Sequence, residues 1–113
     1  MLVFTQMVRG VLEGCLLAVI DEEETYGYEI MEKLALSGFV FAKEGSIYPL
    51  LLRLEKENIV ASTQRPSASG PNRKYYRLTL KGEQQLQLFR GNWHELSNAV
   101  NSIIEKGMMP YVE

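Results

Sequence analysis

The sequence contains few of the residues that build metal centres and disulfides. Its 113 residues include one cysteine, Cys15, and one histidine, His94. A single cysteine excludes a disulfide within the chain. A structural zinc ion needs about four nitrogen or sulfur ligands, more than the His and Cys of this chain supply. Cys15 lies in the apolar run 11–20, which favours a buried thiol over a reactive one. We predict no metal site and no cofactor.

Long apolar runs are also missing. No stretch approaches the roughly 20 apolar residues that cross a bilayer. The start, MLVFTQMVRG, has no basic segment followed by a small-residue cleavage site, so it does not resemble a secretory signal. We expect a cytoplasmic protein with no membrane partner. No Ser/His/Asp or Cys/His set stands out, and no glycine-rich phosphate loop is present, so we do not expect an enzyme.

Charge is present but unevenly distributed along the chain. The net charge is −2. Residues 1–42 carry two basic groups against seven acidic ones, a net charge of −5. Residues 43–81 carry eight basic groups against three acidic ones, a net charge of +5. A basic segment within an acidic chain is typical of a surface that binds a polyanion such as nucleic acid.

Apolar residues at helical spacing predict two helices in the acidic part. The first covers residues 5–20, and the second begins with Thr25 as its cap and ends near Ser37, with a short acidic connection between them. Gly10 and Gly14 lie four residues apart in the first helix. They indicate either the close approach of a backbone or ligand, or two glycines that the helix tolerates.

A third helix is predicted over residues 46–57. Ser46 is a suitable N-cap, which would place Pro49 in the first turn, where its missing N–H costs no hydrogen bond. The spacing directs four apolar residues to the core: Ile47, Leu50, Leu51 and Leu54. It directs a mixed apolar and basic set outward, with Tyr48 on the flank: Pro49, Leu52, Arg53 and Lys56.

The pattern then changes to the period of two that is typical of strands. Strands are expected over 59–65 and 74–78, joined by a turn-rich loop, 66–72. Thr79 begins a last helix, whose apolar residues repeat every three or four positions: Leu86, Phe89, Trp93, Leu96, Val100 and Ile103. This seam predicts dimerisation through the helix, and packing on its own domain is the alternative.

Three helices followed by a hairpin are the order of a winged helix-turn-helix. The predicted fold is therefore mainly α with a small β-hairpin (α+β), with a DNA-binding domain at 1–78 and a C-terminal dimerisation helix and tail at 79–113. In such a domain the third helix enters the major groove of double-stranded DNA and basic loops contact phosphates. The predicted DNA-binding residues are Tyr26, Lys43, Ser46, Tyr48, Pro49, Leu52, Arg53, Lys56, Arg65, Arg73 and Lys74.

The alternative function is a winged-helix protein-interaction module without sequence-specific DNA binding. The acidic net charge fits that function. Tyr48 and Leu52 would then be ordinary surface residues or lie under the wing.

Three segments carry a family resemblance: YGYEIMEKL, EGSIYPLLLRLEKENIV and GPNRKYYRLTLKGEQQL. From about Arg9 to Leu86 the sequence resembles the PadR family of bacterial transcriptional regulators, and is similar to its short subgroup with a single C-terminal helix. The pattern G-S-I-Y-P-x-L-x-R-L-E, followed by R-K-Y-Y-x-L-T-x-x-G, is more specific than a generic helix-turn-helix. The resemblance implies a homodimeric repressor that binds a palindromic operator and is released by a small molecule. It also implies that the last helix packs against the partner's first helix.

The resemblance also implies an effector site. Some short members of the family bind flat, aromatic, often cationic compounds in a pore at the dimer centre, where a tryptophan stacks on the compound. Trp93 occupies the matching place, with Glu13, Gly14 and Ser97 as its expected neighbours. An aromatic ring beside a glycine gap and an acid suits a planar cation; alternatively, Trp93 only fills the dimer seam. The effector would be of the multidrug or phenolic type, although the sequence shows no polar pocket for a phenolic acid.

Overall fold

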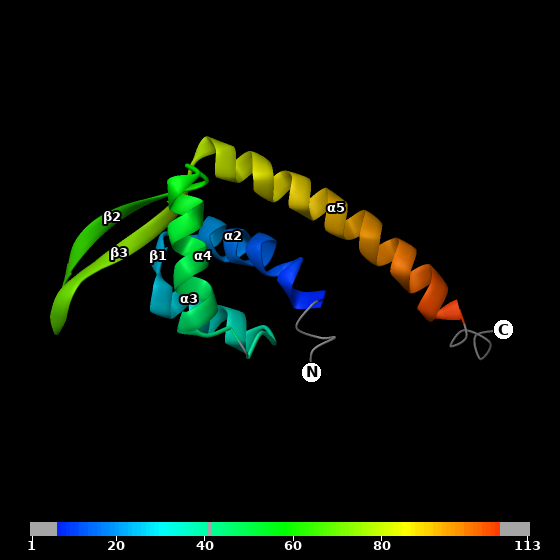
Figure 1. Ribbon diagram of the computed structural model, residues 1–113, viewed down its shortest axis with the longest axis horizontal. Coiled ribbons are helices and arrows are strands. Elements are labelled where there is room, and N and C mark those ends of the chain that lie inside the picture. Colours follow the sequence, from blue (N-terminus) through cyan, green and yellow to red (C-terminus); the bar gives the residue numbers. More distant parts are fainter. Residues whose placement is uncertain (1–6, 41, 107–113) are drawn as a thin grey trace.

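The computed structural model describes residues 7–40 and 42–106 (Figure 1). It is mainly helical with a small antiparallel sheet, which confirms the predicted winged-helix class and the long C-terminal helix. The beginning of the first predicted helix, at residues 5 and 6, and the tail 107–113 lie outside the described residues. The elements are α2 (Leu12–Glu22), β1 (Thr25–Tyr26), α3 (Gly27–Leu36), α4 (Glu44–Lys56), β2 (Val60–Ser67), β3 (Gly70–Leu78) and α5 (Leu80–Ile104).

The first predicted helix is interrupted. Residues 7–9 are helical, Gly10 and Val11 form a turn, and α2 begins only at Leu12. The Val11 N–H donates to the Val8 carbonyl at 2.9 Å. This bond joins residues three positions apart, as in a 3₁₀ turn, whereas an α-helix joins residues four apart. At its other end, α2 continues to Glu22, through the residues predicted as a connection, because Ile20 extends its buried stripe.

Thr25 belongs to a strand that the sequence did not predict. Thr25 and Tyr26 form β1, which pairs with β3 through Thr25↔Tyr76 and Tyr26↔Tyr75, so the sheet order is β1-β3-β2. The second helix, α3, therefore begins at Gly27 instead of directly after a Thr25 cap. The Thr25 hydroxyl donates to the Glu29 carboxylate at 2.7 Å, so this side chain is used within the fold.

The hairpin is longer than predicted. The segment 66–72, expected to be a loop, is mostly strand, and only Ala68 and Ser69 separate β2 from β3. An irregularity explains how two prolines fit: the pairing passes from Arg65↔Arg73 to Ser67↔Gly70, and Pro66 and Pro71 make no pair. Proline cannot donate to a ladder, so a bulge is where a strand accommodates it.

The helix α4 begins before the predicted cap. Its first residue is Glu44, and the N-cap position is occupied by Lys43 in an extended conformation. The Ser46 hydroxyl instead donates to the Lys43 carbonyl at 3.1 Å. Pro49 consequently lies inside the helix. Because proline has no N–H, the helical hydrogen bond that residue 49 would donate to the Gly45 carbonyl is absent.

The hydrophobic core lies where α2, α3 and α4 meet the sheet and the beginning of α5 (Figure 1). Thr79 caps α5 as predicted, since the Gly82 N–H donates to its hydroxyl oxygen at 3.0 Å. Beyond Phe89, which packs on Gly14 of α2, α5 extends away from the domain along the longest axis of the molecule. Among the described residues, no helix has both the length and the apolar character needed to cross a membrane.

Candidate nucleic-acid interface

The helix α4 presents one ridge away from the core. Ile47, Leu51 and Leu54 are fully buried. The opposite side of the helix, by helical spacing, carries a ridge of four exposed residues, here called the outward ridge: Gly45, Pro49, Leu52 and Lys56. The Leu52 side chain is 53% exposed, which leaves a large apolar surface in contact with solvent. The outward ridge is therefore smooth, largely apolar and basic only at its C-terminal end.

One flank of α4 faces α2, and Arg53 is held there. Its guanidinium forms an ion pair with Glu13 of α2 and donates to both carboxylate oxygens of Glu57 at 3.1 Å. These bonds, first the one to Glu13, raise the pKa of Arg53. Ser46 lies on the same flank, beside a hollow of about 570 Å³ between the two helices. These carboxylates compete with DNA for Arg53.

The other flank of α4 carries Tyr48. A Cβ atom on Gly27 would overlap the Tyr48 ring, so the first residue of α3 must be a glycine for the ring to lie there. The ring nevertheless remains 44% exposed. Tyr48 is thus fixed at one edge by α3 and open to solvent at the other.

Two arginines stack on tyrosines on the outer face of the sheet. The Arg73 guanidinium lies 4.4 Å from the centre of the Tyr26 ring, and that of Arg65 lies 4.5 Å from the Tyr75 ring. The two rings contact each other, with centroids 5.3 Å apart. Arg65 also pairs with Glu24. Stacking of this kind stabilises a cation and restricts its side chain, so both arginines are preorganised.

Glu55 connects α4 to both strands of the hairpin. Its carboxylate accepts hydrogen bonds from the Ser62 hydroxyl of β2 at 2.7 Å and from the Lys74 ammonium of β3 at 2.9 Å. These two bonds, in that order, lower the pKa of Glu55, and the bond to Glu55 raises the pKa of Lys74. The sequence did not point to Glu55, because its partners are 7 and 19 residues away. Lys74 is therefore engaged within the fold.

Three of the predicted DNA-binding cations form no ion pair or side-chain hydrogen bond with another described residue. Within residues 7–40 and 42–106, the side chains of Lys43, Lys56 and Arg73 form no ion pair or hydrogen bond. Arg73 has only its stacking on Tyr26. Lys43 and Lys56 lie at the two ends of α4, and Arg73 lies in the hairpin. These are the charges most readily available to an anion outside the chain.

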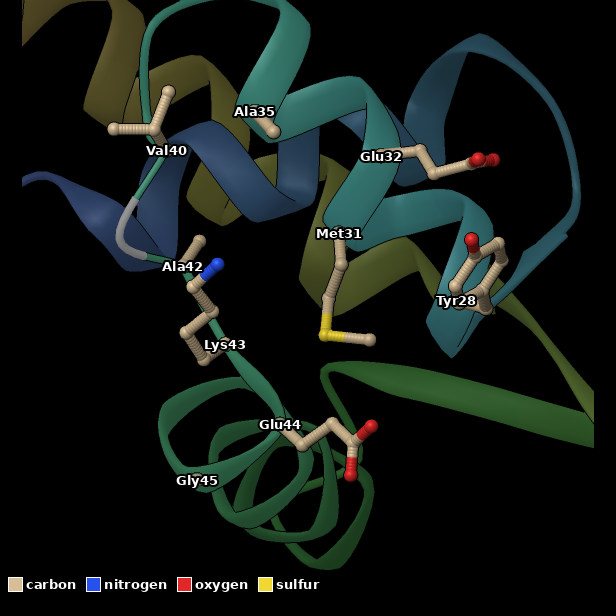
Figure 2. Close-up of a pocket in the computed structure, with 9 residues that line it drawn as sticks. All are labelled: Tyr28, Met31, Glu32, Ala35, Val40, Ala42, Lys43, Glu44 and Gly45. Carbon is tan, nitrogen blue, oxygen red and sulfur yellow. The ribbon is translucent and has the colours of Figure 1, made fainter.

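A hollow of about 460 Å³ separates α3 from the beginning of α4 (Figure 2). Met31 points into it from α3, and Ala42, Lys43 and Glu44 border it from the opposite side. Gly45, the first residue of the outward ridge, completes that border. A space therefore separates α3 from the N-terminal end of the ridge, and an added Cβ atom on Gly45 would meet nothing within 4 Å among the described residues.

The predicted effector residues are not brought together within one chain. Glu13 and Gly14 border a hollow of about 250 Å³ beside Phe89, and Trp93 borders a separate, more apolar one of about 300 Å³ with Val11 among its walls. A Cβ atom on Gly14 would overlap the Phe89 ring. The gap at Gly14 is thus occupied by a side chain of the same subunit.

The predicted dimer seam divides into two parts. Leu86 is buried in the core of its own domain, and Phe89, which is partly buried, packs on Gly14, so contacts within the subunit already involve both residues. Ser97 is half-buried, and its hydroxyl donates to the His94 carbonyl. The rest of the seam is exposed: Trp93, Leu96, Val100 and Ile103.

Cys15, the single cysteine, is partly buried. Burial raises the pKa of the Cys15 thiol, which disfavours the nucleophilic thiolate. The part of the chain that the structure describes holds no cluster of three or more His, Cys, Asp or Glu suited to a metal ion.

Comparison with known proteins gives this geometry a context. Residues 16–88 match the model of the transcriptional regulator PadR-like family. The chain belongs to this family. PadR-like proteins are transcriptional regulators and not enzymes. The matched segment includes every predicted DNA-binding residue, from Tyr26 to Lys74, whereas Glu13 and Trp93 lie outside it.

Solved structures of transcriptional regulators agree with the fold. A PadR-like transcriptional regulator from Bacillus cereus is 51% identical, with a TM-score of 0.81 over 88% of this chain and 97% of that one. A transcriptional regulator from Streptococcus is 44% identical, with a TM-score of 0.77 over 87% and 96%. Bacillus subtilis PadR, solved in complex with operator DNA, is 30% identical, with a TM-score of 0.62 over 68% of this chain and 45% of that one.

Proposed function

We propose that this PadR-like protein is a homodimeric transcriptional repressor that binds a palindromic operator. Residues 1–78 would form the DNA-binding domain and residues 79–113 the dimerisation segment. The observation that carries the proposal is the outward ridge of α4 with unpaired cations around it. The operator complex of Bacillus subtilis PadR supports it, because that protein shares the fold at 30% identity.

The geometry suggests distinct roles for the candidate residues. Leu52 and Pro49 on the outward ridge offer apolar contacts to thymine methyl groups, and Lys56 and Lys43 suit phosphates at either side of the groove. Tyr48 and Ser46, on the flanks of α4, would contact the walls of the groove. Arg53 would read a guanine only after leaving Glu13.

The hairpin would act as the wing of the domain. Arg73, stacked on Tyr26, is placed to contact a phosphate without losing an ion pair. Arg65 and Lys74 would first have to exchange Glu24 and Glu55. We therefore expect Arg73 to provide most of the wing's contribution to affinity.

Selection from random-sequence DNA tests the proposal. We expect one inverted repeat to be enriched, with affinity that falls steeply as salt is raised, because phosphate contacts release counterions. Arg73→Ala should weaken operator and shuffled DNA about equally and reduce the salt slope by about 1. Arg90→Ala removes the same charge from α5, away from the wing, and should leave both affinities unchanged.

The alternative is a protein-interaction module, which the apolar outward ridge also suits. A selection that enriches no sequence, together with equal binding of all DNAs, would contradict operator recognition. Recovery of a protein that contacts Leu52 under the same conditions would favour the interaction module.

We also propose that a small planar aromatic effector, of the multidrug or phenolic type, binds near Trp93 at the subunit interface. The apolar hollow beside Trp93 supports the proposal, and Glu13, Gly14 and Ser97 would come from the facing subunit or the adjoining helix surface. Trp93 is the single tryptophan of the chain, so tryptophan fluorescence reports on this site alone. Planar dyes should quench this fluorescence, and they should also lower the affinity of the protein for its operator. Glu13→Gln should weaken the binding of cationic dyes more than the binding of neutral dyes. If no dye quenches the fluorescence, Trp93 serves only in packing.

A further inference from the structure

The outward ridge contains the two residues that favour a helix least. Gly45 and Pro49 lie four positions apart on the same exposed side of α4. Glycine weakens a helix through its backbone entropy, and proline removes a helical hydrogen bond. Here the lost bond is the one that Gly45 itself would accept. The proline thus removes the helical partner of the glycine's own carbonyl.

Among the described residues, no neighbour requires a glycine at position 45. A Cβ atom there would meet no other atom within 4 Å, and Gly45 does not adopt the left-handed conformation seen at Gly38. By contrast, a Cβ atom on Gly14, Gly27 or Gly82 would collide with Phe89, Tyr48 or Ile59 respectively. Those three glycines are explained by neighbours in the chain. Gly45 is not, and it lies on the surface that faces away from the core.

We propose that Gly45 is the point where α4 comes closest to DNA, so that backbone and not a side chain lies against the base edges. This inference rests on the proposed binding of DNA through α4. A helix with its side chains nearly fills the major groove, which is about 12 Å wide. A ridge without a side chain at its N-terminal end allows the helix to lie deeper.

The missing helical hydrogen bond leaves the Gly45 carbonyl with capacity to accept a hydrogen bond from DNA. The Gly45 carbonyl receives no N–H from Pro49, whose ring stands next to it on the same ridge, and Gly45 itself contributes no side chain. A carbonyl oxygen can accept a hydrogen bond from the exocyclic amine of adenine or cytosine, both of which are displayed in the major groove. The unpaired Lys43 lies two residues before Gly45, where a phosphate at the groove edge would fix the depth of insertion.

Two substitutions of increasing size test the inference. Gly45→Ala should weaken binding to the selected operator several-fold, and Gly45→Leu by at least about tenfold, the range of a lost base contact. Binding to shuffled DNA should fall less, because the phosphate contacts remain. Both variants should melt at or above the wild-type temperature, since alanine and leucine favour helices more than glycine does.

Gly91 provides the matched control. It is also helical and open, with nothing within 4 Å of an added Cβ, and it lies on the side of α5 opposite Trp93 and Leu96. Gly91→Ala and Gly91→Leu should melt at or above the wild-type temperature without changing operator affinity.

Each result decides the question. Operator affinity within twofold of the wild type for Gly45→Leu would overturn the inference. So would a clear fall in its melting temperature, because that would show the space to be occupied within the protein. If the wild type binds no operator at all, the proposed function itself fails, and the inference fails with it.

Discussion

Replacing Gly82 with alanine should lower the melting temperature by roughly 10 °C or more. Gly82 is buried in the first turn of α5, and a Cβ atom there would overlap the backbone carbonyl oxygen of Ile59. Such overpacking costs about 1–3 kcal/mol, and sometimes more. Each kcal/mol shifts the melting temperature of a domain of this size by about 4–8 °C.

The Ile59 carbonyl cannot easily move out of the way. It accepts a hydrogen bond from the Thr79 N–H at 3.1 Å, and it also lies 3.1 Å from the Thr79 hydroxyl, which donates to the neighbouring Asn58 carbonyl at 2.6 Å. The Thr79 hydroxyl oxygen in turn caps α5 through the Gly82 N–H. A shift of Ile59 would therefore disturb the junction of the hairpin with α5, and we expect the helix to lose its cap as well as its packing.

Gly91→Ala is the control for this prediction because it makes the same change in the same helix at an open position. It should raise stability by up to about 1 kcal/mol, the difference in helix propensity. Thermal unfolding followed by circular dichroism, at one protein concentration for both variants, compares them. Equal melting temperatures for the two variants would contradict the close approach at Gly82.

The sequence predicted the elements whose apolar residues repeat with a clear period. The stripe Ile47–Leu54 predicted the buried side of α4, and the order of helices and hairpin predicted the winged-helix class. Short or irregular features were missed for physical reasons. β1 has only two residues, too few to show a period, and it pairs with Tyr75 and Tyr76, some 50 residues later.

The beginning of α4 was misplaced because the prediction relied on the N-cap preference of one residue, whereas packing in the folded protein decides where the helix begins. Ser46 has the chemistry of an N-cap, but Ala42 is buried and the Ser46 and Ile47 N–H groups both donate to Lys43. The helix therefore begins at Glu44, two residues before Ser46. This leaves Pro49 in the helix interior, and the proline that first seemed to mark a helix start instead marks a missing hydrogen bond on the outward ridge.

At the candidate site, the sequence identified which groups are charged but not which of them are available. Arg53 and Glu13 are 40 residues apart, and Lys74 and Glu55 are 19 apart, so no spacing rule could pair them. The fold uses Arg53 and Lys74 in internal contacts, whereas Lys43, Lys56 and Arg73 have no ion pair within the part of the chain that the structure describes. This distinction, which depends on three-dimensional proximity, changes which cations we expect to contribute most to binding.

The seam of α5 shows the same limit. Its period of three and four is unbroken from Leu86 to Ile103, yet Leu86 is buried in its own domain while Leu96 and Val100 are exposed. Periodicity identifies the apolar side of a helix, but not what covers it. The point at which α5 leaves the domain, after Phe89, divides intramolecular packing from the surface that we propose for the partner.

Leu96→Glu should convert the proposed dimer into a monomer. Leu96 is in the middle of the exposed part of the seam, between Trp93 and Val100. Two-fold symmetry would place two new carboxylates in one interface, where buried, unpaired charge is strongly unfavourable. The loss of two buried leucines alone, at about 1.5–3 kcal/mol each, should raise the dimer dissociation constant by at least about 100-fold. Sedimentation equilibrium measures this directly.

Asn98→Glu adds the same charge on the opposite side of α5, by helical spacing, and should leave the dimer intact. The effect of Leu96→Glu on DNA then separates two roles of α5. If two half-sites are bound by joined domains, the monomer loses the second half-site and operator affinity falls by orders of magnitude. A Leu96→Glu monomer that keeps full operator affinity would show that residues 1–78 act as a single reading unit. A Leu96→Glu protein that remains dimeric would show that the subunits meet elsewhere.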